Sequence, residues 1–169
     1  MSSPLLQLGY VSRAHGLNGE LGIRPFDAAS ETLYGVERIH LKLRDGSERT
    51  VKLDSVRDAT KDFLVGIVGV NRRAQAEPLV GATVSVFRED VEPPAEGEYF
   101  LGDLMGLSAV DEQGNALGKV VEIWDSGPVP NLVIRGEGTE LVVPFADEFV
   151  PTVELDKGRL VVRPPEFLE

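Results

Sequence analysis

The sequence predicts an all-β fold made of two consecutive small β-barrels, joined by a proline-containing linker and accompanied by one or two short helices. Short β-branched and apolar runs recur along the chain, separated by Gly, Asn, Asp and Pro about every 8–12 residues. No stretch has the long periodicity of a helical protein. Pro93-Pro94 interrupts the pattern, because proline donates no backbone hydrogen bond. We expect domains over residues 1–92 and 98–169, with a linker over 93–97.

The first domain contains six runs that alternate apolar and polar side chains or are rich in β-branched residues. We expect strands over residues 5–11, 19–23, 38–43, 50–56, 63–67 and 83–87. Asp45-Gly46 favours the primed turn of a tight hairpin between the third and fourth runs. Two short helices fit between the strands, one capped by Ser30 and one capped by Asn71, which Pro78 shortens.

The first two expected strands enclose a glycine-rich loop. Asn18-Gly19 is a strong hairpin signal because both residues tolerate positive φ, and Gly16 adds freedom beside the turn. We expect Arg13 and His15 to project from this loop as contact residues, since loops often carry binding side chains. The alternative is that both are solvated polar residues without a partner.

The same glycines do not make a nucleotide site. A phosphate-binding loop needs Lys and Ser or Thr after its last glycine, whereas Glu20 follows Gly19 here. A second candidate for phosphate contact is the pair Arg72-Arg73 at the expected start of a helix. A solvated helix face explains that pair equally well.

The second domain reads as a further set of short strands, expected over residues 106–110, 116–124, 131–134, 140–143 and 159–162. Tyr99-Phe100 follows the linker, and Asp103 comes soon after. If these residues form a strand, one aromatic enters the core and its neighbour faces outward. An outward aromatic in an acidic domain would be an anchor for a protein partner, whereas two inward aromatics would only close the barrel.

Charge divides the chain at the same boundary. Residues 1–92 carry 12 Lys and Arg against 13 Asp and Glu, whereas residues 93–169 carry 5 against 15, so the net charges are −1 and −10. An acidic second half repels nucleic acid and attracts a basic protein, within a screening distance of about 8 Å in physiological salt. Solubility alone is the alternative explanation of an acidic surface.

Residue types exclude several kinds of chemistry. The chain has no Cys and 2 His, which are far apart, so we expect no disulfide, no metal site and no cofactor. Acidic residues that would serve a hydrolase are Asp103, Asp111, Glu112, Asp147 and Glu148, although a solvated acidic surface explains them better. No signal peptide or long apolar segment is present, so a cytoplasmic location and no membrane contact are expected.

Several motifs together resemble the RimM family of ribosome maturation factors. The first domain carries the family's His-Gly-x-x-Gly-Glu at residues 15–20 and its Arg-x-x-Ala-Glu-x-Leu-x-Gly at 73–81. The second domain is similar to a PRC-barrel, through residues 98–106, 114–120 and 143–145. The family usually has paired tyrosines where this chain has Tyr99-Phe100.

This resemblance implies a non-enzymatic assembly factor that binds the free small (30S) ribosomal subunit and promotes head maturation and 16S rRNA processing. It implies a basic head protein, number nineteen of the small subunit, as partner of Tyr99, Phe100 and Asp103. Arg13, His15, Arg72 and Arg73 would then face nearby 16S rRNA, from a protein expected to be a monomer. The alternatives are a stand-alone RNA-binding β-barrel module, which would bind naked rRNA with a steep salt dependence, and a hydrolase with two facing carboxylic acids.

Overall fold

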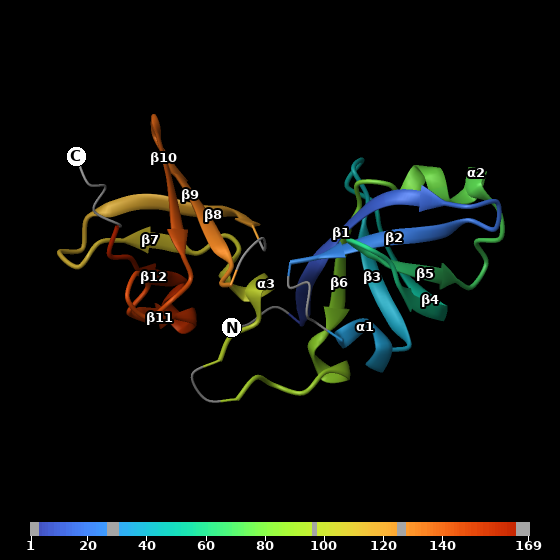
Figure 1. Cartoon of the computed structure of the whole chain (residues 1–169), viewed down its shortest axis with the longest axis horizontal. Coiled ribbons are helices and arrows are strands. Elements are labelled where there is room, and N and C mark those ends of the chain that lie inside the picture. The colour runs from blue at the N-terminus through green and yellow to red at the C-terminus, as the bar shows by residue number, and fades with distance from the viewer. Residues whose placement is uncertain (1–3, 27–30, 96–97, 125–127, 165–169) are drawn as a thin grey trace. The chain divides into compact units, whose positions relative to one another are not determined.

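The all-β prediction is confirmed by the computed structural model, which describes residues 4–26, 31–95, 98–124 and 128–164. The chain divides into two compact units, residues 3–96 and residues 97–169 (Figure 1). Between the last short helix of the first unit and the first helix of the second, residues 93–95 are exposed and have no regular secondary structure.

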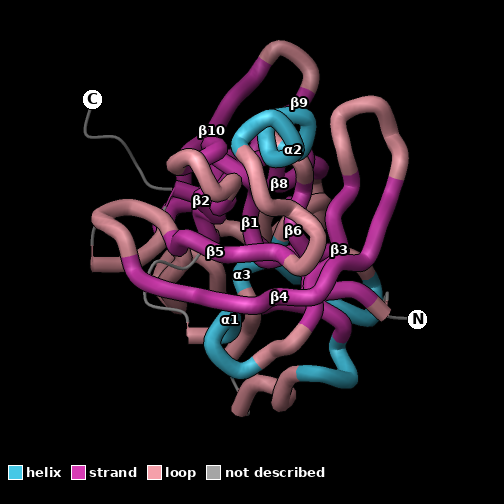
Figure 2. Tube along the Cα trace, turned by 90° about the vertical axis from the view of Figure 1, so that its right-hand side faces the viewer, coloured by secondary structure: helices cyan, strands magenta, loops and turns pink. Residues whose placement is uncertain are grey.

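The first unit is a closed barrel of six strands (Figure 2). The strands are β1 (Leu5–His15), β2 (Glu20–Pro25), β3 (Arg38–Lys42), β4 (Glu48–Asp58), β5 (Phe63–Ile67) and β6 (Thr83–Phe87). They are hydrogen-bonded in the order β1-β2-β5-β4-β3-β6, and β6 pairs antiparallel with β1 to close the ring. Closure leaves no free sheet edge, which is the usual way for a small β-domain to avoid edge-to-edge association.

The β1–β2 hairpin differs from the predicted one in two ways. Strand β1 continues to His15, which pairs with Glu20, so Arg13 and His15 lie on the strand and not on the loop. Gly16 and Gly19 have positive φ values of 70° and 77°, whereas no described residue other than glycine does. The expectation of positive φ at Asn18 is therefore wrong: the hairpin loop spans residues 16–19, and its two glycines lie in the left-handed region.

The β3–β4 turn departs from prediction in the same manner. Gly46 has a φ of 89°, but Asp45 does not have positive φ, so this turn is not a primed one either. The Asp45 carboxylate instead accepts hydrogen bonds from the backbone N–H and the hydroxyl of Ser47, at 2.8 and 2.6 Å. A short acceptor side chain thus stabilises the turn where the backbone twist was expected to do so.

The helices of the first unit are short, as predicted. They are α1 (Thr32–Gly35), α2 (Arg73–Ala76), and the 3₁₀ turns η1 (Glu77–Leu79) and η2 (Arg88–Asp90). Arg72 is the N-cap of α2, so the expected Asn71 cap is wrong; the Gln75 side chain accepts from the backbone N–H groups of both Asn71 and Arg72. The expected cap Ser30 lies outside the described residues.

The second unit is a six-stranded sheet with the order β10-β9-β8-β7-β12-β11. Its elements are α3 (Leu101–Leu104), β7 (Ser108–Val110), β8 (Ala116–Trp124), β9 (Asn131–Gly136), β10 (Thr139–Pro144), β11 (Thr152–Glu154), η3 (Leu155–Lys157) and β12 (Arg159–Val161). The sequence predicted all but β11 and the helices, which are only three or four residues long. Strand β12 pairs parallel with β7, and the other pairs are antiparallel.

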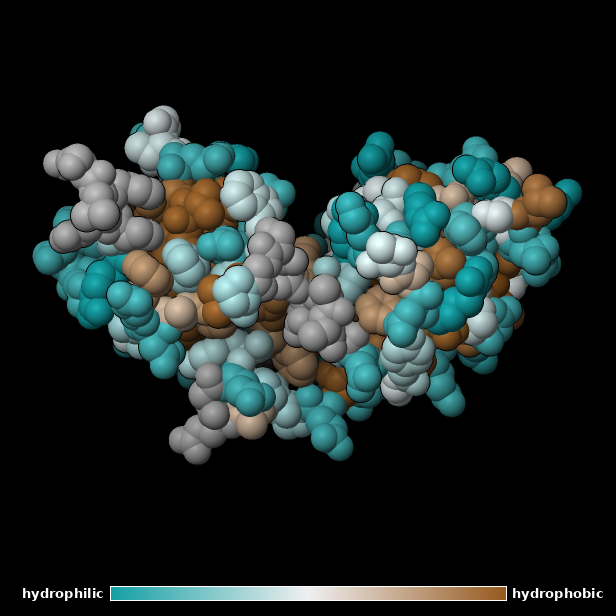
Figure 3. Space-filling model, in the orientation of Figure 1, coloured by the Kyte–Doolittle hydropathy of each residue, from teal (hydrophilic) through white to brown (hydrophobic). Residues whose placement is uncertain are grey.

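Each unit is organised around buried aliphatic side chains. The core of the second unit includes Leu104, Leu132, Ile134 and Leu160, all fully buried. Hydrophilic side chains cover much of the visible face of each unit, with smaller hydrophobic areas between them (Figure 3). The polar groups that matter for binding are therefore placed on rigid sheets that have cores of their own.

Candidate functional site

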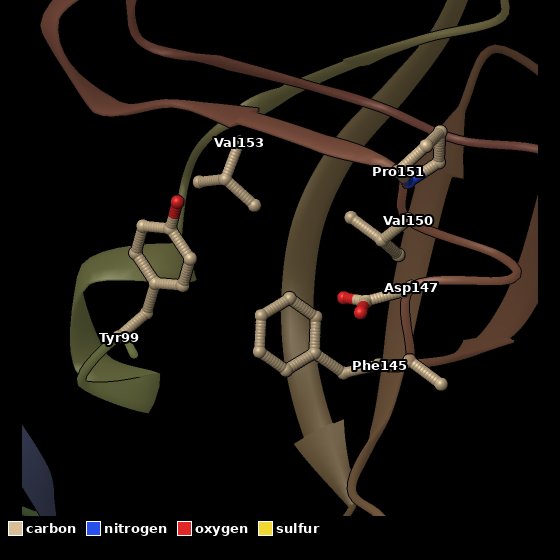
Figure 4. Close-up of a pocket in the computed structure, with 7 residues that line it drawn as sticks. Tyr99, Phe145, Asp147, Val150, Pro151 and Val153 are labelled. Carbon is tan, nitrogen blue, oxygen red and sulfur yellow. The ribbon is translucent and has the colours of Figure 1, made fainter. Parts of the chain in front are cut away.

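A surface cavity on the second unit brings Tyr99 opposite Phe145. The two rings lie edge to face with centroids 6.3 Å apart. The cavity has a volume of about 280 Å³ and is also lined by Asp147, Val150 and Val153. Tyr99 lies on one side, Phe145 and Val150 lie on the other, and the Asp147 carboxylate points into the space between them (Figure 4). An apolar hollow with a single carboxylate suits an aliphatic side chain that ends in a positive charge.

A second hollow of about 380 Å³ shares Tyr99 and Val153 with the first and extends to Leu155 and Asp156. Tyr99 thus separates two adjoining depressions, which together we call the Tyr99 surface. Leu155 is 41% exposed, a large apolar side chain left uncovered beside acidic residues. Exposed apolar groups framed by polar ones are typical of protein-binding surfaces.

The positive charges of the second unit are mostly neutralised by its own acids. Four of its five basic residues form ion pairs, with Glu140, Glu154 and Glu112 as partners: Arg135–Glu140, Arg159–Glu154, Lys157–Glu154 and Arg163–Glu112. Asp147 and Asp156 are exposed in the hollows beside Tyr99. The negative charge that remains is thus free to attract a basic partner.

The three residues expected to bind a ribosomal protein do not lie on a strand, so the strand assumed for Tyr99 and Phe100 is wrong. Both precede helix α3 and both are partly buried, with Tyr99 packed against the core. Phe100 is the N-cap of α3, and its carbonyl accepts the backbone N–H of Asp103 at 3.0 Å. The short helix thus keeps the three residues together at the start of the second unit.

On the first unit, Arg13 is part of an ion-pair cluster around Asp62. Arg13 donates from Nε to Oδ2 at 3.1 Å and from Nη2 to Oδ1 at 3.3 Å, and the Ser12 hydroxyl donates to Oδ2 at 2.9 Å. The Asp62 side chain is only 4% exposed, whereas that of Arg13 is 47% exposed. Gly22 makes room for this cluster, because a Cβ there would lie 2.6 Å from Asp62 Oδ2 and 2.9 Å from Arg13 Cγ.

The Asp62 carboxyl stays charged despite its burial. Burial raises its pKa, but hydrogen bonds from Arg13 and Ser12 and the positive charges of Arg13 and Arg24 lower it by more than burial raises it. The pKa of Asp62 therefore lies below its ordinary value. The carboxylate therefore remains a permanent acceptor that fixes one edge of the Arg13 guanidinium.

Arg13 and His15 line a cleft of about 430 Å³ that was not expected from the sequence. Arg24, Arg57 and Lys61 line the same cleft, from strand β2, strand β4 and the β4–β5 loop. These three residues are spread over almost forty positions of the chain. Only strand pairing brings them together, so no local motif in the sequence announces them.

Arg72 and Arg73 are not among the residues that line the cleft. They lie at the start of α2, where the backbone N–H of Arg73 donates to the Leu17 carbonyl of the β1–β2 loop at 3.2 Å. Arg73 also forms an ion pair with Glu77 at 3.4 Å. The four expected rRNA contacts therefore form two pairs, one in the cleft and one beside the hairpin loop.

Two of the acidic residues considered for hydrolysis, Asp111 and Glu112, are engaged structurally. Hydrogen bonds from the backbone and side chain of Asn115 lower the pKa of Asp111, and the Arg163 guanidinium lowers the pKa of Glu112. A general acid needs the opposite shift. In the described part of the chain, no cluster of three or more metal-ligating side chains was found, and no helix is long and apolar enough to span a bilayer.

Fold and surfaces together define a two-domain all-β protein, a closed barrel with a basic cleft followed by an acidic sheet with an aromatic hollow. Residues 6–91 match the RimM N-terminal domain, and residues 101–168 match the RimM PRC barrel domain. The ribosome maturation factor RimM of Myxococcus xanthus is 61% identical over 99% of this chain and 90% of its own length. That of Anaeromyxobacter dehalogenans is 42% identical, covering 97% of both.

The chain belongs to the RimM family of ribosome maturation factors. A solved RimM structure from Pseudomonas aeruginosa is 23% identical to it, covering 94% of this chain and 96% of that one with a TM-score of 0.47. Family membership confirms the resemblance seen in the sequence motifs and supports a role in ribosome assembly.

Proposed function

We propose that this protein is a non-catalytic assembly factor that binds the free small (30S) ribosomal subunit through a basic head protein, number nineteen of that subunit. The single observation that carries the proposal is the Tyr99 surface, an aromatic hollow on a unit whose own cations are largely paired with its acids. Aromatic anchors supply much of the binding energy in protein interfaces, and uncompensated acids select a basic partner.

In this proposal the first unit faces 16S rRNA close to the bound protein. Arg13 and His15 on one side of the β1–β2 hairpin, and Arg72 and Arg73 beside its loop, are the proposed contacts. Binding one arrangement of the immature head more tightly than others would shift the population toward that arrangement. Head maturation and 16S rRNA processing would follow without any chemical step on this chain.

Co-sedimentation with dissociated ribosomal subunits at low salt tests the proposal. We expect the protein to travel with free small subunits, and Tyr99→Ala combined with Phe100→Ala to weaken that association about thirtyfold, the effect of losing a hot spot of about 2 kcal/mol. Absence of the wild-type protein from the small-subunit fraction would end the proposal.

Because Tyr99 also packs against the core, a second variant is needed that does not touch the core. Asp147→Lys with Asp156→Lys reverses two exposed charges on the Tyr99 surface. We expect it to abolish co-sedimentation, whereas Glu122→Lys with Glu137→Lys, which line neither hollow, should weaken it much less. Equal losses for both pairs would show that net charge alone, and not this surface, governs binding.

A further inference from the structure

We propose that the cleft of the first unit, lined by Arg13, His15, Arg24, Arg57 and Lys61, is a binding site for the phosphodiester backbone of RNA. This inference rests on the proposed function, since it names the part of the first unit that would hold rRNA. It also moves the contact away from the hairpin loop, toward residues on β2, β4 and the β4–β5 loop.

Two of the guanidinium groups are held in place before any ligand arrives. Asp62 fixes Arg13 through two hydrogen bonds. Glu20 fixes Arg57 through Nε–Oε2 and Nη2–Oε1 contacts of 3.2 and 2.7 Å. A guanidinium has five N–H donors, so each retains donors after its carboxylate is satisfied. Preorganised donors of this kind lose little side-chain entropy when a phosphate binds.

His15 adds a donor to the same cleft. Its Nδ1 atom lies 3.0 Å from Arg13 Nη1. Because a guanidinium can only donate, Nδ1 is the acceptor, and the proton of neutral His15 is on Nε2. The imidazole can therefore donate a hydrogen bond to a phosphate oxygen from its far side.

Four cationic side chains and two carboxylates line the cleft, so positive charge remains after both carboxylates are counted. Asp62 is engaged by Arg13 and Ser12, and Asp58 accepts the hydroxyl hydrogen bond of Tyr34. Arg24 and Lys61 are exposed, and in the described part of the chain their side chains form no hydrogen bond or ion pair with another residue. These two cations are the ones that a phosphate would neutralise most directly.

The lining favours RNA over an acidic peptide. Leu64 and Ala59 are the apolar residues of the cleft, and no Phe, Tyr or Trp lines it, so an interface anchor and a base-stacking platform are both missing there. Cations with a Thr60 hydroxyl suit phosphate and ribose, which carry no sequence information. We therefore expect binding that does not depend on base identity.

The test is fluorescence anisotropy of the full chain with a labelled 12-nucleotide oligouridine in 50 mM salt. Arg24→Gln with Lys61→Gln should raise Kd about tenfold and reduce the slope of log K against log salt by about 1.4, as expected for two lost phosphate contacts on a single strand. The matched control, Lys42→Gln with Arg49→Gln, removes the same charge from exposed positions of β3 and β4 outside the cleft. It should change Kd less than twofold.

Equal Kd values for the two double variants would contradict the proposal that the cleft binds RNA. Displacement of oligouridine by polyglutamate as readily as by unlabelled oligouridine would contradict it as well. Oligoadenosine should bind as oligouridine does; a large preference for either base would contradict backbone recognition. Failure of the wild-type protein to sediment with small subunits would contradict the proposed function. The effect of Arg24→Gln with Lys61→Gln on the Kd for oligouridine would not be changed by that failure, so the two outcomes are distinguishable.

Discussion

Asp62 is an almost fully buried carboxylate that accepts two hydrogen bonds from the Arg13 guanidinium. It lies 49 residues from Arg13, and nothing in its local pattern separates it from the other acids of an acidic chain. Its importance arises from burial beside Gly22 and from two donors on β1, which only the barrel brings together. Arg13 and His15, by contrast, were predictable as contact candidates because they stand next to a recognisable hairpin signal.

Replacing Asp62 by Asn tests its role in holding Arg13. The amide keeps the shape but loses the charge, so the hydrogen bonds from Arg13 weaken, and we expect the free energy of unfolding at pH 7 to fall by about 1–2 kcal/mol. Urea unfolding followed by circular dichroism measures this. Glu37→Gln, at an exposed position of the same unit, should change stability by less than about 0.5 kcal/mol.

The stability difference between wild type and Asp62→Asn should depend on pH. The folded pKa of Asp62 is lowered, so its contribution is fully present above the unfolded pKa of about 3.9 and is lost as pH falls through the folded value. The stability difference between wild type and Asp62→Asn should therefore be constant from pH 7 to about pH 5 and shrink below about pH 4. A difference that persists unchanged to pH 2 would contradict a charge-based role.

The β1–β2 hairpin illustrates which features of a β-element are local and which are not. Its place in the chain followed from the glycines and the flanking apolar runs, and the structure has it there. Its turn type and the extent of β1 did not follow, because the loop packs against α2: a Cβ at Gly19 would lie 2.5 Å from the Arg72 carbonyl oxygen. A contact across more than fifty residues thus selects the turn geometry.

Gly16 and Gly19 offer a matched pair of substitutions for this contact. Both have positive φ, so alanine costs about 1–2 kcal/mol of strain at either position. Gly16 faces open space, whereas Gly19 abuts the Arg72 backbone, so Gly19→Ala should destabilise the protein by at least about 1 kcal/mol more than Gly16→Ala. Urea midpoints of the two variants measure the difference. Equal midpoints would mean that the loop and α2 separate at no cost.

In the second unit, the shortest elements were the ones that could not be predicted from the sequence. Strand β11 (Thr152–Glu154) has three residues and is too short for alternation to register, and α3 has four. No strand forms at Tyr99-Phe100, because these residues lead into α3. A helix of four residues leaves almost no periodic signal in the sequence. The longer strands β8 and β9, with their turn residues, were recoverable from pattern alone.

Charge is the property of the chain as a whole that the sequence conveyed best. Residue counts locate the acidic half of the chain. Only the structure shows that Arg135, Arg159 and Arg163 form ion pairs within that half. Conversely, a first unit with a net charge near zero contains a local concentration of cations in its cleft. Net charge therefore understates the difference between the surfaces that the two units present to their surroundings.

This charge distribution predicts how binding to the proposed partner, the purified basic head protein, responds to salt. Long-range attraction acts on encounter, so the association rate should fall about tenfold or more between 50 and 300 mM salt while the dissociation rate changes little. Asp147→Asn with Asp156→Asn and Glu122→Gln with Glu137→Gln each remove two negative charges and should slow association similarly. Only the first pair lies on the Tyr99 surface and should also speed dissociation. Stopped-flow kinetics separates the two rates, and a salt effect confined to dissociation would contradict steering by the acidic unit.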